Sequence, residues 1–117
     1  MTENLPRVNF RELLLLFLRR RKRLKVVGES MLPLLKPGDE IIVNPYAYAK
    51  SSPQIDDVVV LVHPLQKSLV IVKRIAALDA QNRCFLLGDN SQQSTDSRHW
   101  GTIKSANIIG KVSSQFY

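Results

Sequence analysis

The sequence predicts a mainly β domain that carries one helix close to its N-terminus. Two observations favour this fold class. Between residues 40 and 112, short runs rich in valine, isoleucine and leucine alternate with turn sequences, and before them a leucine-rich stretch has the spacing of an α-helix. A chain of 117 residues fits one domain, which can bury a core without a disulfide or a structural metal.

The N-terminal part is predicted to be a loose arm over residues 1–9, followed by a helix from Phe10 to about Arg23. The apolar side chains of this segment fall on one helical stripe. The stripe consists of Phe10, Leu13, Leu14, Phe17 and Leu18. We therefore expect the helix to pack against the domain or to lie on a surface.

Five runs are predicted to be strands: residues 40–43, 58–62, 69–75, 83–87 and 107–112. Turn sequences rich in proline, glycine, serine and asparagine separate them. Several short strands with regular turns indicate an antiparallel sheet that is coiled or partly closed. We divide the chain into an N-terminal arm with a basic helix, residues 1–25, and a β domain, residues 26–117.

The positive charge of the chain is concentrated in one segment. The formal net charge is +7, yet six of the seven residues from Arg19 to Lys25 are basic, which leaves 11 basic against 10 acidic residues elsewhere. Such a run is either a solvated helix end or a contact for RNA, anionic lipid or an acidic protein. The longest apolar run, residues 13–18, is far shorter than the roughly 20 residues of a membrane span. Together with the single cysteine, Cys84, this predicts a cytoplasmic protein without an intrachain disulfide.

The first candidate for chemistry is Ser30, within residues 28–33, where a strand-like stretch gives way to a loop. A serine hydroxyl becomes a nucleophile only when a base takes its proton. Neither histidine, His63 or His99, has the local signature of a triad. The segment alone is therefore weak evidence of catalysis.

The second candidate is Lys73, which shares one face of its predicted strand with Ile71 and Ile75. Burial of a lysine disfavours its charged form and lowers its pKa, so that a neutral amine becomes available as a base. The alternative is a lysine whose stem covers apolar surface while its amine stays in water.

The third candidate is the long polar segment 88–101. In it Asp96 and Arg98 can form a clamp that fixes the loop, and Ser94 or Ser97 can hydrogen-bond a buried lysine amine. The alternative is an ordinary loop of Asx turns.

Taken in order, the three segments resemble the type I signal peptidase superfamily of Ser–Lys proteases. Residues 28–33 with 36–39 resemble its nucleophile box, residues 57–60 with 72–75 its lysine box, and residues 88–101 with 109–112 its last box. The resemblance implies a catalytic core of the signal-peptidase and LexA type. It also implies a substrate bound as an added strand.

The resemblance assigns roles residue by residue. Ser30 is expected to attack the scissile carbonyl and Lys73 to accept its proton, with the two side chains in hydrogen-bond reach. Supporting positions in the nucleophile loop and the last box are Gly28, Met31, Pro33, Gly88, Asp89, Asn90, Ser94, Asp96, Ser97 and Arg98. Gly28 stands where some bacterial members have a second oxyanion-stabilising serine, so the oxyanion hole is completed in another way.

Two departures from the membrane-bound members narrow the resemblance. The sequence has no transmembrane anchor, and only 14 residues separate Lys73 from Gly88, where those members often carry a large insert. These features resemble the nickel-type superoxide dismutase maturation proteases, which implies a cytoplasmic endopeptidase that removes an N-terminal leader from that precursor. No cofactor and no metal are expected, because Cys84, His63 and His99 lack ligand spacing.

Other functions remain open at this point. A secretory-type signal peptidase bound peripherally to a membrane is one alternative, and a LexA-like Ser–Lys protease is another, although residues 1–25 are short for a DNA-binding domain. A degenerate, inactive protease is disfavoured by the presence of both Ser30 and Lys73. An RNA-binding β-barrel is disfavoured because the basic run has no interleaved aromatic residues, so no nucleic acid is expected as a partner. Weak contact with an anionic membrane through residues 19–25 is expected instead.

Overall fold

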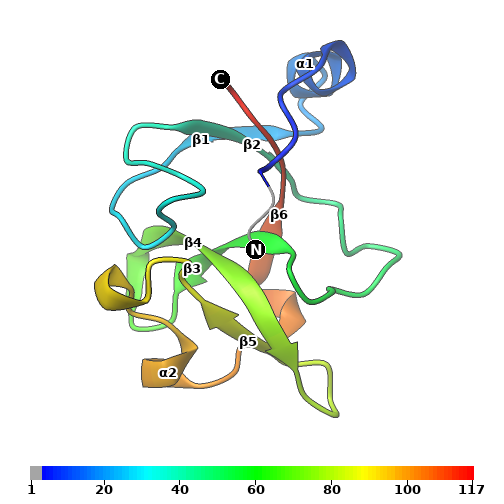
Figure 1. Cartoon of the computed structure of the whole chain (residues 1–117). Coiled ribbons are helices and arrows are strands. Elements are labelled where there is room, and N and C mark those ends of the chain that lie inside the picture. Colours follow the sequence, from blue (N-terminus) through cyan, green and yellow to red (C-terminus); the bar gives the residue numbers. More distant parts are fainter. Residues whose placement is uncertain (1–3) are drawn as a thin grey trace.

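An antiparallel sheet of six strands organises the computed structural model, which describes residues 4–117 (Figure 1). The strands are β1 (Lys22–Lys25), β2 (Glu40–Asn44), β3 (Val58–His63), β4 (Gln66–Leu78), β5 (Cys84–Leu87) and β6 (Ile108–Gln115). The helices are α1 (Phe10–Phe17) and α2 (Ser97–Trp100), with 3-10 turns η1 (Ser91–Gln93) and η2 (Ser105–Asn107). The mainly β fold with an N-terminal helix is confirmed.

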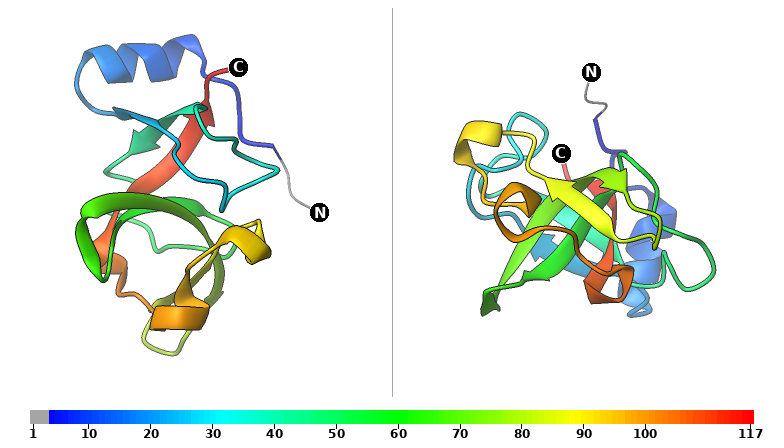
Figure 2. Two further views of the ribbon diagram at one scale, coloured as in Figure 1. Left: turned by 90° about the vertical axis from the view of Figure 1, so that its left-hand side faces the viewer. Right: turned by 90° about the horizontal axis from the view of Figure 1, so that it is seen from below.

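The strand order is β1-β2-β6-β3-β4-β5, so β6 lies between two groups of strands. β6 pairs with β2 on one side and with β3 on the other. The order runs from β1 at one edge to β5 at the other, so the sheet is open. Figures 1 and 2 place α1 and α2 at opposite ends of the molecule.

The predicted helix ends six residues earlier than its sequence indicated. Asn9 caps α1 by accepting a 2.9 Å hydrogen bond from the backbone N–H of Glu12. The helix ends at Phe17, and Arg19 has a φ of 63°, a left-handed conformation that cannot continue an α-helix. Residues 22–25 then form β1 by pairing with β2, so the prediction of a helix to Arg23 is wrong. Strand pairing here overrides the helix propensity of arginine and lysine.

Two apolar clusters cover the two faces of the sheet. Because side chains alternate along a strand, Val58 and Val60 of β3 enter the first cluster, whereas Val59 and Leu61 enter the second. Val59 is paired with Lys73 of β4. The register therefore places the lysine on the face of the second cluster.

The N-terminal arm runs beside the end of β6. Val8 donates a 3.0 Å backbone hydrogen bond to Gln115, and Gln115 donates one of 2.9 Å to Pro6. In the described part of the chain, residues 4–117, no helix combines the length and the apolar character needed to cross a lipid bilayer.

Candidate active site

Ser30 lies in the long connection between β1 and β2, directly before a buried anchor. Met31 is only 2% exposed and packs in the first cluster, whereas Gly28 and Pro33 are exposed at either side of the serine. Gly28 has a φ of +79°, which suits glycine and turns the chain before Ser30. Between the turn and the Met31 anchor, Ser30 is half-buried.

Lys73 is buried at 3% exposure in the middle of β4. Ile75, on the same face of the strand, is fully buried, and Ile71 packs beside it against the second cluster. The Lys73 amine donates a 3.0 Å hydrogen bond to Ser94 Oγ. Burial lowers the pKa of Lys73, the Asp96 carboxylate opposes this effect, and the Arg98 guanidinium adds to it.

Asp96 is fully buried and collects the hydrogen bonds of this region. Its Oδ2 accepts from Ser94 Oγ at 2.8 Å and from the Gly88 backbone N–H at 3.0 Å. Arg98 donates to both carboxylate oxygens, each at 2.9 Å, which gives the paired clamp expected from the sequence. Burial by itself pushes the pKa of Asp96 upward, but these hydrogen bonds outweigh it and hold the pKa well below its usual range.

Gly88 brings the serine loop and the lysine support together. A Cβ atom on Gly88 would lie 2.2 Å from Ser94 Oγ and 2.7 Å from the Ser30 carbonyl oxygen. Real Cβ atoms do not approach other atoms so closely, so only glycine fits at this position. Ser30 and Ser94 thus flank the same point of the chain.

Asn90 connects the last box to the nucleophile loop through two hydrogen bonds. Its backbone N–H donates to the Ser30 carbonyl at 2.8 Å, and its side-chain Nδ2 donates to the Glu29 carbonyl at 3.1 Å. These bonds join positions about sixty residues apart. They fix the backbone on which the Ser30 hydroxyl is carried.

Two contacts of the last box were not foreseen. Arg74, next to Lys73 but on the opposite face of β4, forms a bidentate ion pair with Asp89 at 2.8 and 2.9 Å. Ser97 Oγ accepts a hydrogen bond from the Leu86 backbone at 2.8 Å, so Ser94 alone contacts the lysine amine. The sequence signals for the Arg74–Asp89 pair were an arginine next to Lys73 and an acidic residue in the last box.

Within the described residues 4–117, Ser30 and Lys73 do not form the hydrogen bond that the sequence led us to expect. The Lys73 amine donates to Ser94 instead. The Lys73 amine is therefore held by Ser94, and Ser30 lies on a separate loop.

A groove of about 270 Å³ adjoins Ser30 and is mainly apolar. It is lined by Leu24, Lys25, Val26, Val27, Gly28, Ser30, Met31, Leu69, Val70, Ile71 and Val72. Because β5 pairs with β4 only from Arg74 onward, the backbone of residues 69–72 is not paired on that side by β5. A larger hollow, about 1130 Å³, lies beside the N-terminal arm and includes neither Ser30 nor Lys73. The smaller groove includes Ser30 and ends at Val72, directly before Lys73, which is not part of its lining.

Comparison with known proteins shows that residues 13–82 and 80–117 match the family model described as signal peptidase, peptidase S26. The chain is 26% identical over 136 residues to a Synechocystis protein named probable signal peptidase I-1, covering 79% of this chain and 69% of that protein. It is also 26% identical over 129 residues to the probable thylakoidal processing peptidase 2, chloroplastic, of Arabidopsis thaliana, covering 74% of this chain but only 35% of that protein. A 32-residue stretch is 50% identical to signal peptidase I of Buchnera aphidicola.

Proposed function

The chain belongs to the signal peptidase family, peptidase S26, a family of serine peptidases, and on this premise we propose that it is a Ser–Lys endopeptidase acting on precursor proteins. Ser30 is the nucleophile and Lys73 is the general base. The observation that carries the proposal is the buried amine of Lys73, supported by Ser94 and next to the Gly88 backbone against which the Ser30 carbonyl packs.

The reaction uses the two side chains in turn. Lys73 accepts the proton of Ser30 as Oγ attacks the scissile carbonyl carbon, and the protonated amine then gives this proton to the leaving amine of the substrate. Water attacks the acyl-serine in the second half, again with Lys73 as base. This step releases the new carboxylate and restores the Ser30 hydroxyl.

Arg98 makes this chemistry compatible with a nearby carboxylate. An unpaired Asp96 beside Lys73 would stabilise the ammonium form, which cannot act as a base. The bidentate contact from Arg98 offsets this charge, while Asp96 still accepts the hydrogen bond that orients Ser94. The lysine is thereby oriented by the network without being held in its charged form.

The groove beside Ser30 suits a substrate bound as an added strand. The unpaired backbone of residues 69–72 offers hydrogen-bond groups to an extended peptide on one side. The segment around Val26 and Gly28 closes the other side. The small, mostly apolar groove favours small apolar side chains near the cut.

For the substrate we propose the precursor of nickel-type superoxide dismutase, cleaved in the cytoplasm. The support is the short connection between the lysine box and the last box, with 14 residues between Lys73 and Gly88. Secretory precursors are the second candidate, because the similar proteins are named signal and thylakoidal processing peptidases.

Co-expression with each precursor tests both parts of this proposal, with the intact mass of the precursor as the readout. We expect the superoxide dismutase precursor to lose its leader with the wild type and to stay intact with Ser30→Ala. Cleavage of a secretory precursor alone would replace the proposed substrate. Cleavage of either precursor by Ser30→Ala would contradict the proposed nucleophile.

A further inference from the structure

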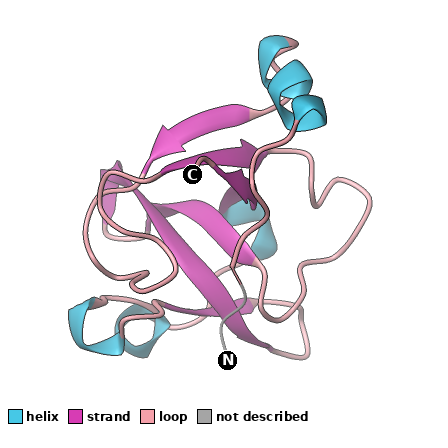
Figure 3. Ribbon diagram, turned by 45° about the horizontal axis from the view of Figure 1, so that its top comes forward, coloured by secondary structure: helices cyan, strands magenta, loops and turns pink. Residues whose placement is uncertain are grey.

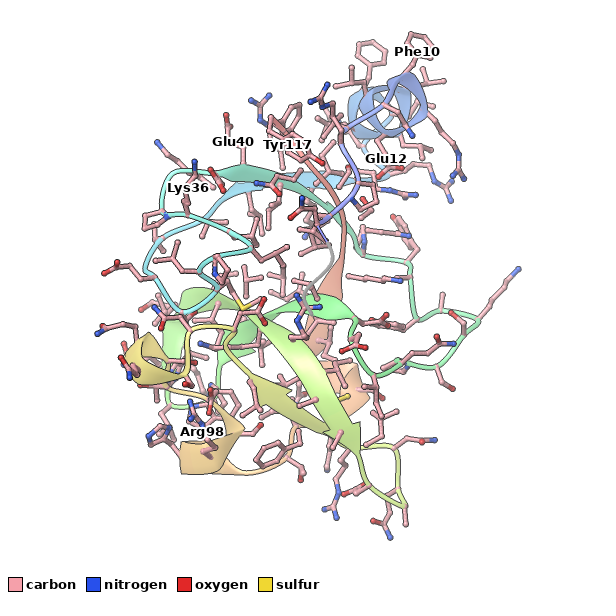
Figure 4. The ribbon with its side chains drawn as sticks, viewed as in Figure 1. Phe10, Glu12, Lys36, Glu40, Arg98 and Tyr117 are labelled. Atoms are coloured by element: carbon pink, nitrogen blue, oxygen red, sulfur yellow. The ribbon has the colours of Figure 1, made fainter. Side chains whose placement is uncertain are left out.

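Helix α1 is attached to the domain on the side that carries Glu12, where Leu15 and Leu16 are partly buried, and it presents its other apolar side chains to solvent. Its one buried residue is Glu12, at 7% exposure. Phe10 and Phe17 are 79% and 81% exposed, and three leucines beside them are about half exposed. Those leucines are Leu13, Leu14 and Leu18. In Figure 4, Phe10 lies on the outer side of α1 and Glu12 on the side that faces the sheet.

This orientation is fixed by specific contacts. Glu12 accepts a 3.2 Å hydrogen bond from Arg21 Nε and a further one from the hydroxyl of Ser113 in β6. Arg21 also donates to Asn44 Oδ1 at 3.2 Å. A buried ion pair with additional hydrogen bonds is costly to break from one side, so α1 cannot simply turn its apolar face inward.

Free positive charge lies next to the exposed apolar face. Of the basic run, Arg21 and Arg23 are paired with Glu12 and Glu40. Arg19, Arg20 and Lys22 are exposed and have no acidic partner in the described part of the chain. A partner for this end of the molecule must therefore be apolar where it meets the phenylalanines and anionic where it meets these cations.

We propose that α1 and the residues that follow it dock the enzyme on an anionic lipid bilayer. Leucine and phenylalanine on one side of a helix, with arginine and lysine beside it, is the composition of helices that lie in the membrane interface. The helix stands out from the end of the molecule as a ridge (Figure 3). A fluid bilayer accepts a ridge without a preformed groove, whereas a protein partner would need a matching groove with an acidic rim.

Vesicle co-sedimentation tests this proposal in the full chain. Vesicles of phosphatidylcholine alone are compared with vesicles that contain phosphatidylglycerol, at low and at high salt. We expect binding to the anionic vesicles, weakened by salt because exposed charges are screened over about 10 Å at 0.1 M.

Two variants separate the apolar and the charged contributions. Phe10→Ser with Phe17→Ser removes the apolar contact, and its control, Ile55→Ser with Leu65→Ser, removes two exposed apolar side chains elsewhere. Arg19→Asn, Arg20→Gln and Lys22→Gln remove three charges, with asparagine at 19 because it tolerates a positive φ. The control, Lys50→Gln, Lys67→Gln and Lys104→Gln, removes three exposed charges elsewhere.

We expect each α1 variant to lose binding to anionic vesicles by about tenfold or more, and each control to retain it. Unchanged melting temperatures will show that all four variants are folded. The proposal is overturned if the wild type stays unbound at low salt, or if the controls lose as much as the α1 variants. It is also overturned if the α1 variants keep vesicle binding and lose precursor capture or self-association instead.

Discussion

The amine of Lys73 in β4 and the hydroxyl of Ser94, 21 residues further along the chain, are joined by a 3.0 Å hydrogen bond. Ser94 in turn donates a hydrogen bond to Asp96, which also accepts hydrogen bonds from Arg98. The buried lysine thus has a hydrogen-bond acceptor, and the nearby Asp96 carboxylate is itself paired with Arg98. Burial together with this pairing favours a neutral, oriented amine.

Replacing Lys73 by arginine tests the need for a base that can lose its proton. Arginine stays charged at all working pH values, so Lys73→Arg is expected to lower kcat by about a thousandfold or more. Lys67→Arg, at an exposed position of the same strand, should retain full activity. The measurement is cleavage of the precursor by purified enzyme. Near-normal turnover in Lys73→Arg would exclude Lys73 as the general base.

Arg98→Gln is expected to move the pH profile without moving the nucleophile. Loss of the guanidinium leaves the Asp96 charge less compensated and removes a direct repulsion, and both effects raise the pKa of Lys73. The neutral amine is the active form, so the acid limb of kcat/KM should shift to higher pH. A pH–rate series on wild type and variant measures the shift. A displacement of the acid limb to lower pH would contradict the predicted rise in the pKa of Lys73.

Gly88→Ala is expected to damage the site by direct contact. The added methyl group meets Ser94 Oγ and the Ser30 carbonyl at distances that force both away. Gly101→Ala is the matched control, because its Cβ would meet open space and only its backbone conformation, with φ of 77° and ψ of −166°, is strained. We expect Gly88→Ala to lose activity and Gly101→Ala to lose about 1–3 kcal/mol of stability with kcat unchanged.

Asn90→Asp tests the connection between the last box and the serine loop. The change keeps the shape of the side chain but replaces the donor to the Glu29 carbonyl by a carboxylate that repels it. We expect a fall in kcat of about tenfold, with the fold retained. Asn82→Asp, in an exposed turn, is the control, and equal activity of the two variants would show that this hydrogen bond does not position Ser30.

Asp96 is expected to make stability depend on pH in the acid range. Its pKa is lowered in the folded protein, so its contribution is complete above the unfolded value near 3.9 and is lost as pH falls through the folded value. Asp96→Asn should lose about 1–3 kcal/mol at pH 7, and the gap to wild type should narrow below about pH 4. Urea unfolding at several pH values measures this, with the exposed Asp56→Asn as control, and a gap that widens in acid would contradict it.

The strands were predictable because their signal is local. The five predicted runs match β2 to β6 within a few residues, since alternating β-branched residues and turn sequences are properties of short segments. β1 was missed because Lys22–Lys25 contains a single leucine, and only its partner strand makes it a strand. Likewise, nothing local marks the end of the helix: Arg19 has a left-handed conformation, and the chain then enters β1, which pairs with β2.

The candidate site likewise combines residues that a local motif indicates with contacts that only the folded chain shows. Ser30, Lys73 and the Asp96–Arg98 pair could be selected from ordered motifs, and their catalytic roles stay predictions until they are tested. The contacts that Asn90 makes with the serine loop join segments about sixty residues apart, and no local sequence pattern indicates which distant segments will meet. Choosing Ser94 over Ser97 as the lysine's partner also required the geometry of the loop.

The position of β6 between the two groups of strands has a consequence for folding during translation. Ser30 belongs to the half of the sheet built from β1 and β2, and Lys73 to the half built from β3, β4 and β5. β6, which follows the other five strands in the chain, pairs with both halves. Long-range pairings of this kind form late, so in a nascent chain that still lacks β6 the two halves are not yet connected by strand pairing. We therefore expect the serine loop and the lysine strand to be aligned by the sheet only once translation has passed residue 115.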